Sequence, residues 1–200
     1  NACKPEGFWG RFFVFRMNIA AHARLARWGF SLLEDVPEGV RVLDAGCGGG
    51  GNVARWLKLF KPSKVFGLDY SEVSVRKSRS VNRKAIREGK AEIVHAGVSA
   101  IPLPEGILDY VSAFETIYFW PDILSDFKEV RRVLKKGGVF LICNESNGLD
   151  EGARKMTGII EGMNLYDAKS ISSLLEEVGF GDVSIHNHPD NHWLCILARK

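Results

Sequence analysis

Long hydrophobic runs are missing from this chain of 200 residues, and so is a strong charge of either sign. No apolar run approaches the roughly 20 residues that a helix needs to cross a bilayer. The 27 lysines and arginines exceed the 24 acidic residues by only 3, which by itself does not indicate a nucleic-acid or membrane surface. With 46% hydrophobic residues, we expect a soluble globular protein with a full core and no membrane partner.

Clustered cysteines are missing as well. Cys3, Cys47, Cys143 and Cys195 have neither the spacing of metal ligands nor the density of a disulfide framework. No signal peptide is visible. These features predict a protein of the reducing cytoplasm, without a metal site.

Apolar and amphipathic segments alternate along most of the chain, which predicts an α/β protein with a doubly wound, mostly parallel sheet covered on both faces. A turn at Pro189-Asp190-Asn191 joins the last two strands into a closing antiparallel hairpin. The expected strands cover residues 41–46, 64–70, 91–96, 108–114, 138–145, 182–188 and 192–200. The expected helices cover residues 52–60, 72–89, 125–138 and 170–180.

The first 35 residues lie outside this alternation, and they are rich in aromatic residues and arginine. We expect residues 1–35 to form a helical lid that covers the main domain, which consists of residues 36–200. Met17, Asn18 and His22 would face the site. A plain packing helix is an equal alternative, because aromatic residues favour burial. A membrane-surface helix is a third.

Five glycines between Gly46 and Gly51 follow the first strand, where an open parallel sheet binds its ligand. No Lys-Ser or Lys-Thr follows them, which excludes a phosphate-binding P-loop. The spacing fits a dinucleotide fingerprint, but Asp44 at the strand end would repel a pyrophosphate and suits a ligand with an ammonium group and a positive sulfur. No tyrosine is followed four residues later by lysine, which argues against a short-chain dehydrogenase.

The segments VLDAGCGGG, GLDYS, LDYVSAFETIYFW and LKKGGVFLICNE resemble the successive motifs of class I S-adenosylmethionine-dependent methyltransferases. The likeness is greatest to the ubiquinone- and menaquinone-biosynthesis type of the small-molecule branch, and it covers residues 36–200. The resemblance implies a seven-stranded sheet with an antiparallel last strand. It also implies methyl transfer to a small organic acceptor, with S-adenosylhomocysteine as the second product.

The resemblance assigns roles to the matching positions. Asp44 would bind the methionine ammonium, and Asp69 would accept both ribose hydroxyls. The backbone of Gly46, Cys47 and Gly48 would line the methionine arm. The remaining cofactor-binding positions are Tyr70 and Ser71 beside the adenine, Gly97, Val98 and Ser99 at its edge, and Phe114 and Glu115 beside the sulfonium.

One motif departs from the family. Relatives usually have Gly-Asp-Ala shortly before a Leu-Pro, and that acid receives the adenine amino group, whereas this chain has Gly97 in the place of the acid. We therefore expect backbone groups around Val98 or the Ser99 hydroxyl to recognise the adenine.

Methyl transfer from a sulfonium needs positioning more than a catalytic group. If the acceptor arrives protonated, Glu115 is our first candidate for a general base and His188 the second. Tyr118, Trp120 and His192 are further candidates for contacting the acceptor. Aromatic packing, and solvated turn histidines, are the simpler alternatives. A metal site made by His186, His188 and His192 lacks a fourth ligand.

Two other functions stay open. A basic stripe formed by Arg76, Arg79, Arg83 and Arg87 would suit an RNA methyltransferase, but such stripes are usually solvated and no aromatic stacking platform accompanies this one. A cofactor-binding protein without turnover is the other alternative. The sequence predicts neither the identity of the acceptor nor the oligomeric state.

Overall fold

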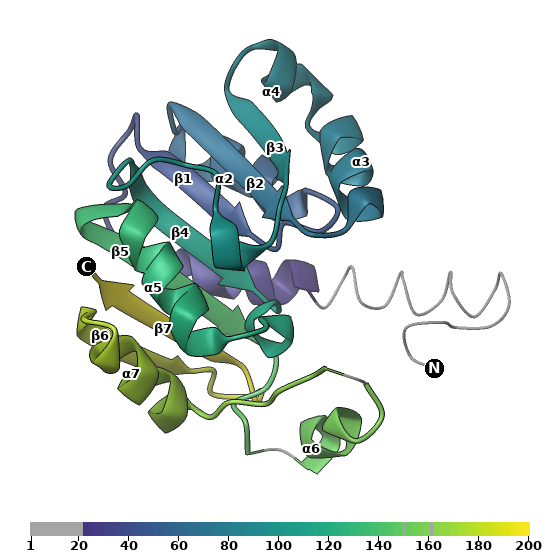
Figure 1. Ribbon diagram of the computed structural model, residues 1–200, viewed down its shortest axis with the longest axis vertical. Helices are drawn as coiled ribbons and strands as arrows, with labels where there is room; N and C mark the ends of the chain where they lie inside the picture. Colours follow the sequence, from purple (N-terminus) through teal and green to yellow (C-terminus); the bar gives the residue numbers. More distant parts are fainter. Residues whose placement is uncertain (1–21, 150, 161) are drawn as a thin grey trace, which may run out of the picture.

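The computed structural model describes residues 22–149, 151–160 and 162–200. Figure 1 shows a twisted seven-stranded sheet with helices on both of its faces. A helix whose described part covers residues 22–31 precedes the sheet. The strands are β1 (Arg41–Ala45), β2 (Lys64–Asp69), β3 (Ala91–His95), β4 (Leu108–Phe114), β5 (Leu134–Asn144), β6 (Gly181–Asn187) and β7 (Leu194–Arg199). The α-helices are α2 (Gly51–Phe60), α3 (Glu72–Val81), α4 (Arg83–Arg87), α5 (Ile123–Val133), α6 (Glu151–Thr157) and α7 (Ala168–Glu177), and the 3₁₀ turns are η1 (Val98–Ala100) and η2 (Ile117–Phe119).

The strand order is β3-β2-β1-β4-β5-β7-β6. Pairings are parallel from β3 through β5, whereas β7 runs antiparallel to both β5 and β6. The predicted seven-stranded, mostly parallel α/β fold is confirmed. Because the chain winds outward in one direction from β1 and in the other from β4, a crevice forms at the carboxyl ends of these two neighbouring strands, where doubly wound proteins bind ligands.

Each face of the sheet has its own hydrophobic core. On one face, Phe127 of α5 and Ile171 of α7 pack against β4 and β5. On the other face, Trp56 of α2, together with Leu25 and Phe30 of the helix over 22–31, packs against β1 and β5. All five of these side chains are almost fully buried. The helix over 22–31 is therefore part of the second core. The lid predicted for residues 1–35 stays a prediction. Met17 and Asn18 lie outside the described residues.

Two predicted helices end earlier than expected. The helix predicted over 72–89 divides at Asn82, whose side-chain amide donates to the carbonyls of Gly50 and Ser78. Helix α5 ends at Val133 rather than in the Lys-Lys-Gly-Gly segment, because Leu134 already pairs with Leu108 of β4. The short helix α6 was not predicted.

The helices of the described residues include none that is long and apolar enough to cross a membrane.

Candidate active site

A cavity of about 450 Å³ lies at the carboxyl ends of β1, β2 and β4. Its wall contains one residue of the glycine turn, the end of β2, the segment from Ala96 to Ser99, and the segment that follows β4. The lining residues are Gly46, Leu68, Asp69, Tyr70, Ala96, Gly97, Val98, Ser99, Glu115, Thr116, Phe119, Trp120, Pro121 and Gly162. Five segments of the chain, with Gly162 as the fifth, thus meet at the crevice that the strand order creates.

The glycine turn needs a glycine at position 46. The φ angle of Gly46 is +80°, and a Cβ atom at this position would lie 2.4 Å from Cγ2 of Thr116. The backbone N–H groups of Gly46 and Cys47 both donate to the carbonyl of Leu68, at 2.8 and 2.9 Å. The turn is therefore fixed to the end of β2, and no side chain at position 46 stands between the backbone and the cavity.

Asp69 connects the glycine turn to the segment after β2. One carboxylate oxygen accepts from the N–H of Gly48 at 2.8 Å, and the other accepts from the N–H of Ser71 at 2.9 Å. Only 7% of Asp69 is exposed, and the residue lines the cavity. A carboxylate oxygen has more than one lone pair, so each oxygen of Asp69 retains the capacity to accept a further hydrogen bond from a ligand.

Asp44 is buried beneath the glycine turn, with 1% of its surface exposed. Its Oδ1 accepts from the Ser112 hydroxyl at 2.9 Å, and that hydroxyl oxygen accepts from the indole N–H of Trp56 at 3.0 Å. Its Oδ2 is buried and has no hydrogen-bond partner among the described residues. Burial raises the pKa of Asp44 to about 7, and the negative charge of Asp69 adds to the rise.

Glu115 follows β4 in a left-handed backbone conformation, with φ at +60°, which residues other than glycine rarely adopt. Its Oε1 accepts hydrogen bonds from the N–H of Glu145 and from the Tyr118 hydroxyl. Burial raises the pKa of Glu115 to about 8. Ligand atoms of His22, Glu115 and Glu145 lie within 4.8 Å of one another. The structure therefore joins the end of β4, the end of β5 and the helix over 22–31 beside the cavity.

Comparison with known proteins identifies the family. The model of a methyltransferase domain family matches residues 43–142, which include β1 through most of β5. The chain belongs to the class I S-adenosylmethionine-dependent methyltransferases. Among curated relatives, cycloartenol-C-24-methyltransferase 1 of Oryza sativa is 32% identical over 143 residues, 67% of this chain and 40% of that protein. Sterol 24-C-methyltransferase of Aspergillus fumigatus is 37% identical over 108 residues, 52% of this chain and 28% of that protein.

The chain spans about half or less of the length of the curated relatives that it matches. Solved methyltransferases share its fold at low sequence identity. Geranyl diphosphate C-methyltransferase from Streptomyces coelicolor superposes with a TM-score of 0.79 at 14% identity, covering 98% of this chain and 87% of that one. An S-adenosylmethionine-dependent methyltransferase from Mesorhizobium loti has a TM-score of 0.72 at 20% identity, covering 88% and 98%.

The residues of this chain fit the family's cofactor in chemistry and in shape. The buried Asp44 Oδ2, to which no described residue donates a hydrogen bond, suits an ammonium group, because a buried carboxylate oxygen is stabilised by a cationic donor. The open backbone at Gly48, where a Cβ atom would meet nothing within 4 Å, leaves room for a ligand. Tyr70 leaves 76% of its surface exposed at the cavity wall, which is unusual for an aromatic side chain and suits stacking against a nucleobase.

Several predicted site residues line the cavity directly, and others lie outside its wall. Those in the lining are Gly46, Asp69, Tyr70, Gly97, Val98, Ser99, Glu115 and Trp120. Those outside it are Asp44, Cys47, Gly48, Ser71 and Phe114, which lie in or beside the same turns, together with His22, Tyr118, His188 and His192. Burial raises the pKa of the Cys47 thiol to about 12, so it is no nucleophile at neutral pH.

The histidines of the terminal hairpin lie away from the cavity lining. The His188 ring packs against Trp28 and Trp193, with centroids 5.2 and 4.8 Å away, and its Nδ1 accepts from the N–H of Asp190. His192 is exposed. Within the described residues, these histidines form no group with metal-binding geometry. Contact of His188 or His192 with an acceptor stays a prediction.

The basic stripe is divided and partly occupied. It crosses the break between α3 and α4, Arg76 forms an ion pair with Glu72 at 2.7 Å, and Arg79 donates to the carbonyl of Ile93 at 2.9 Å. Arg83 and Arg87 line a shallow surface hollow together with Arg79. These contacts give the stripe a structural role at the edge of the sheet.

Sequence reasoning missed the contacts that cross between strand ends. Thr116 belongs to the cavity wall, and Glu145 contacts Glu115 although 30 residues separate them. Asp126 of α5 is completely buried, and it binds Ser99 of the wall. The polar residues directly after the fifth strand were a signal for Glu145, because the carboxyl ends of β4 and β5 are neighbours in the sheet.

Proposed function

We propose that this chain binds S-adenosylmethionine and transfers its methyl group to a small organic acceptor, giving S-adenosylhomocysteine as the second product. The observation that carries the proposal is the pair of acids around the glycine turn. Asp44 lies buried below the turn with one oxygen that has no hydrogen-bond partner in the described part of the chain, and Asp69 faces the cavity beside it. Two carboxylates placed in this way suit a nucleoside with a cationic amino-acid arm, and they repel a pyrophosphate.

In this proposal the ammonium group binds at Asp44, and the backbone of Gly46, Cys47 and Gly48 follows the methionine arm. Asp69 accepts the ribose hydroxyls, Tyr70 covers one adenine face with Ser71 beside it, and Gly97, Val98 and Ser99 form the adenine edge. Phe114 and Glu115 lie at the sulfur. Support comes from the shared cavity, whose wall contains Gly46, Asp69, Tyr70, Glu115 and the three residues of the adenine edge.

When bound, S-adenosylmethionine would supply a methyl group activated by a positively charged sulfur, with neutral S-adenosylhomocysteine as the leaving group. The protein orients the acceptor and excludes water, and such positioning supplies on the order of 7–11 kcal/mol of the barrier reduction. For an acceptor that must lose a proton, we propose Glu115 Oε as the base. Its raised pKa, about 8, places proton uptake near neutral pH. His188 stays a second candidate on sequence grounds.

We propose a small acceptor because the named relatives and neighbours include methyltransferases for sterols and for geranyl diphosphate. Trp120 lines the cavity, and Tyr118 binds Glu115 next to it. Met17, Asn18, His22 and His192 remain predicted acceptor contacts. Of these, His22 lies beside Glu115 and Glu145. The cytoplasm remains the predicted compartment.

Calorimetric titration with S-adenosylhomocysteine tests the proposal. Wild type and the surface control Asp190→Ala should bind with equal affinity, whereas Asp69→Ala should bind at least tenfold more weakly, because a ligand hydroxyl pair loses its charged acceptor. Equal binding by Asp69→Ala would remove the ribose assignment.

Transfer of a radiolabelled methyl group into small molecules of a cell extract tests turnover. Binding without any transfer would favour the non-catalytic alternative. Label in macromolecules that ribonuclease removes would favour RNA as the acceptor.

A further inference from the structure

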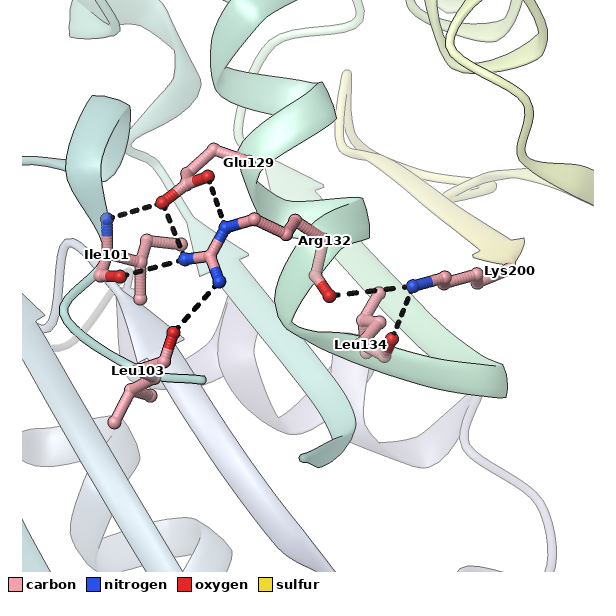
Figure 2. A network of polar contacts seen from close by, with 6 residues as sticks. All are labelled: Ile101, Leu103, Glu129, Arg132, Leu134 and Lys200. Carbon is pink, nitrogen blue, oxygen red and sulfur yellow. Dashed lines mark hydrogen bonds and ion pairs between the residues drawn. The ribbon is translucent and has the colours of Figure 1, made fainter. Parts of the chain in front are cut away.

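One face of α5 holds the segment that forms the adenine edge of the cavity. Asp126, Glu129 and Arg132 are three residues apart along the helix, so they share a face. Asp126 binds Ser99 in η1, and Glu129 accepts from the N–H of Ile101 at 2.8 Å. Figure 2 shows the second half of this contact, in which the Arg132 guanidinium donates to the carbonyls of Ile101 and Leu103 at 2.9 and 3.0 Å.

The contact between Ser99 and Asp126 fixes the direction of one proton. The Ser99 hydroxyl donates to Asp126 Oδ1 at 2.6 Å, a short distance typical of a charge-assisted hydrogen bond. The other carboxylate oxygen, Oδ2, accepts from the backbone N–H of Asp122 at 3.2 Å. Asp126 itself is fully buried. A serine hydroxyl has one proton, so Ser99 Oγ presents only acceptor capacity to the cavity that it lines.

Gly97, two residues before Ser99, has no side chain that could accept a hydrogen bond from the adenine. Gly97 lies where relatives of this family carry an acid, and a Cβ atom there would meet nothing within 4 Å. Val98 has an apolar side chain that is buried in the core, so this side chain cannot form a hydrogen bond with the adenine. Among the three residues of the adenine edge, Ser99 is therefore the one with a polar side chain. Asp126 determines where its hydroxyl proton points.

We propose that Ser99 recognises the amino group of the cofactor's adenine, and that Asp126 is the positioning residue that makes Ser99 an acceptor by holding its proton. The inference rests on the proposed function and names the feature of the cofactor that this cavity selects. The adenine amino group is a hydrogen-bond donor and matches an acceptor. A purine with a carbonyl oxygen at the same position, such as hypoxanthine, places an acceptor against an acceptor. We therefore expect selectivity between the two bases.

The test compares S-adenosylhomocysteine with S-inosylhomocysteine by calorimetry. Wild type should bind the adenosyl compound about tenfold more tightly, as expected when one hydrogen bond is exchanged for an unpaired buried group. Ser99→Ala should reduce this ratio to less than about threefold, and Ser99→Thr, which keeps the hydroxyl, should restore it.

Asp126→Asn gives the sharper result. The backbone N–H of Asp122 donates to Oδ2 of Asp126, so it favours the amide orientation that turns the new carbonyl oxygen toward it and the NH₂ group toward Ser99. Ser99 then accepts from the amide, and its own proton is free to point into the cavity. The adenosyl preference should disappear or reverse. The matched control is Glu129→Gln, on the same helix face and the same segment but without contact to Ser99, which should leave the ratio of the two affinities unchanged.

The outcomes separate this inference from the proposed function. If wild type binds S-adenosylhomocysteine but both ligands bind equally well, or if Ser99→Ala keeps the tenfold ratio, backbone groups recognise the base and the inference fails while the proposed function stands. If Asp126→Asn and Glu129→Gln change the ratio alike, Asp126 acts only through the stability of the segment, and its positioning role is overturned. If wild type binds neither compound, both proposals fail together.

Discussion

Binding of S-adenosylhomocysteine should depend steeply on pH through Asp44. The raised pKa, about 7, comes first from burial, then from the charge of Asp69, and it is opposed by the Ser112 hydroxyl and by Arg55. An ammonium group binds the ionised carboxylate, so affinity should rise as pH rises through 7. With this pKa, the ionised fraction grows roughly 30-fold between about pH 5.5 and pH 8, and the association constant should follow it.

Calorimetry across this range, in buffers of constant ionic strength, measures the effect. Asp44→Asn is isosteric and cannot ionise, so its weaker binding should be nearly independent of pH. Because Glu115 also has a raised pKa, about 8, the variant Glu115→Gln serves as the control that removes the other buried acid near the site. A wild-type association constant that stays within a factor of two from pH 5.5 to pH 8 would refute the assignment of the ammonium to Asp44.

The free protein gives an independent check of the same pKa. Folded Asp44 keeps its proton up to about pH 7, whereas an unfolded aspartic acid loses it near its ordinary pKa of 3.8. The folded state therefore binds more protons between these values, and stability falls as pH rises from about 4 to about 7. For one group this loss is on the order of 4 kcal/mol. Asp44→Asn should show a smaller fall in melting temperature over this range.

Further substitutions separate shape from charge. Asp69→Ala should weaken S-adenosylhomocysteine binding at least tenfold in calorimetry, and an unchanged affinity would contradict the ribose assignment. Gly46→Ala should destabilise the fold or abolish binding, because its Cβ atom would meet Thr116 at 2.4 Å, while Gly39→Ala, with a similar φ of +82° in open space, should cost only about 1 kcal/mol in a denaturant melt. Glu115→Gln should lower the rate of methyl transfer about 100-fold or more while binding persists, and full activity would exclude a general-base role.

Much of the fold was predictable because local patterns determine it. Several strands end at an acid or a glycine turn, and the hydrophobic period changes where helices begin. Six of the seven strands therefore start within two residues of their predicted starts. The start of β5 was predicted too late. Its first residues look like a helix end in the sequence, but pairing of Leu134 with Leu108 and the ion pair of Lys135 with Asp109 at 2.6 Å extend the strand.

The site was only partly predictable, because the contacts that the sequence did not predict depend on the order of the strands in the sheet. Glu115 directly follows β4 and Glu145 directly follows β5, and helix α5 separates the two strands in the sequence. The polar residues after each strand were visible locally, but their contact follows only from the pairing of β4 with β5. Asp126 occupies a helix position that looks like a solvated first turn. Its burial follows from the way η1 packs across α5, which composition does not reveal.

The interior position of β7 has a consequence for the order in which a nascent chain can fold. This strand lies between β5 and β6, and Trp193 at its start contacts Trp28 of the helix over 22–31. About 160 residues must leave the ribosome between these two tryptophans before the helix meets its aromatic partner, a separation typical of slow, non-local assembly. Until then Leu25 and Phe30 face an incomplete sheet, and an apolar surface exposed in this way favours aggregation during folding.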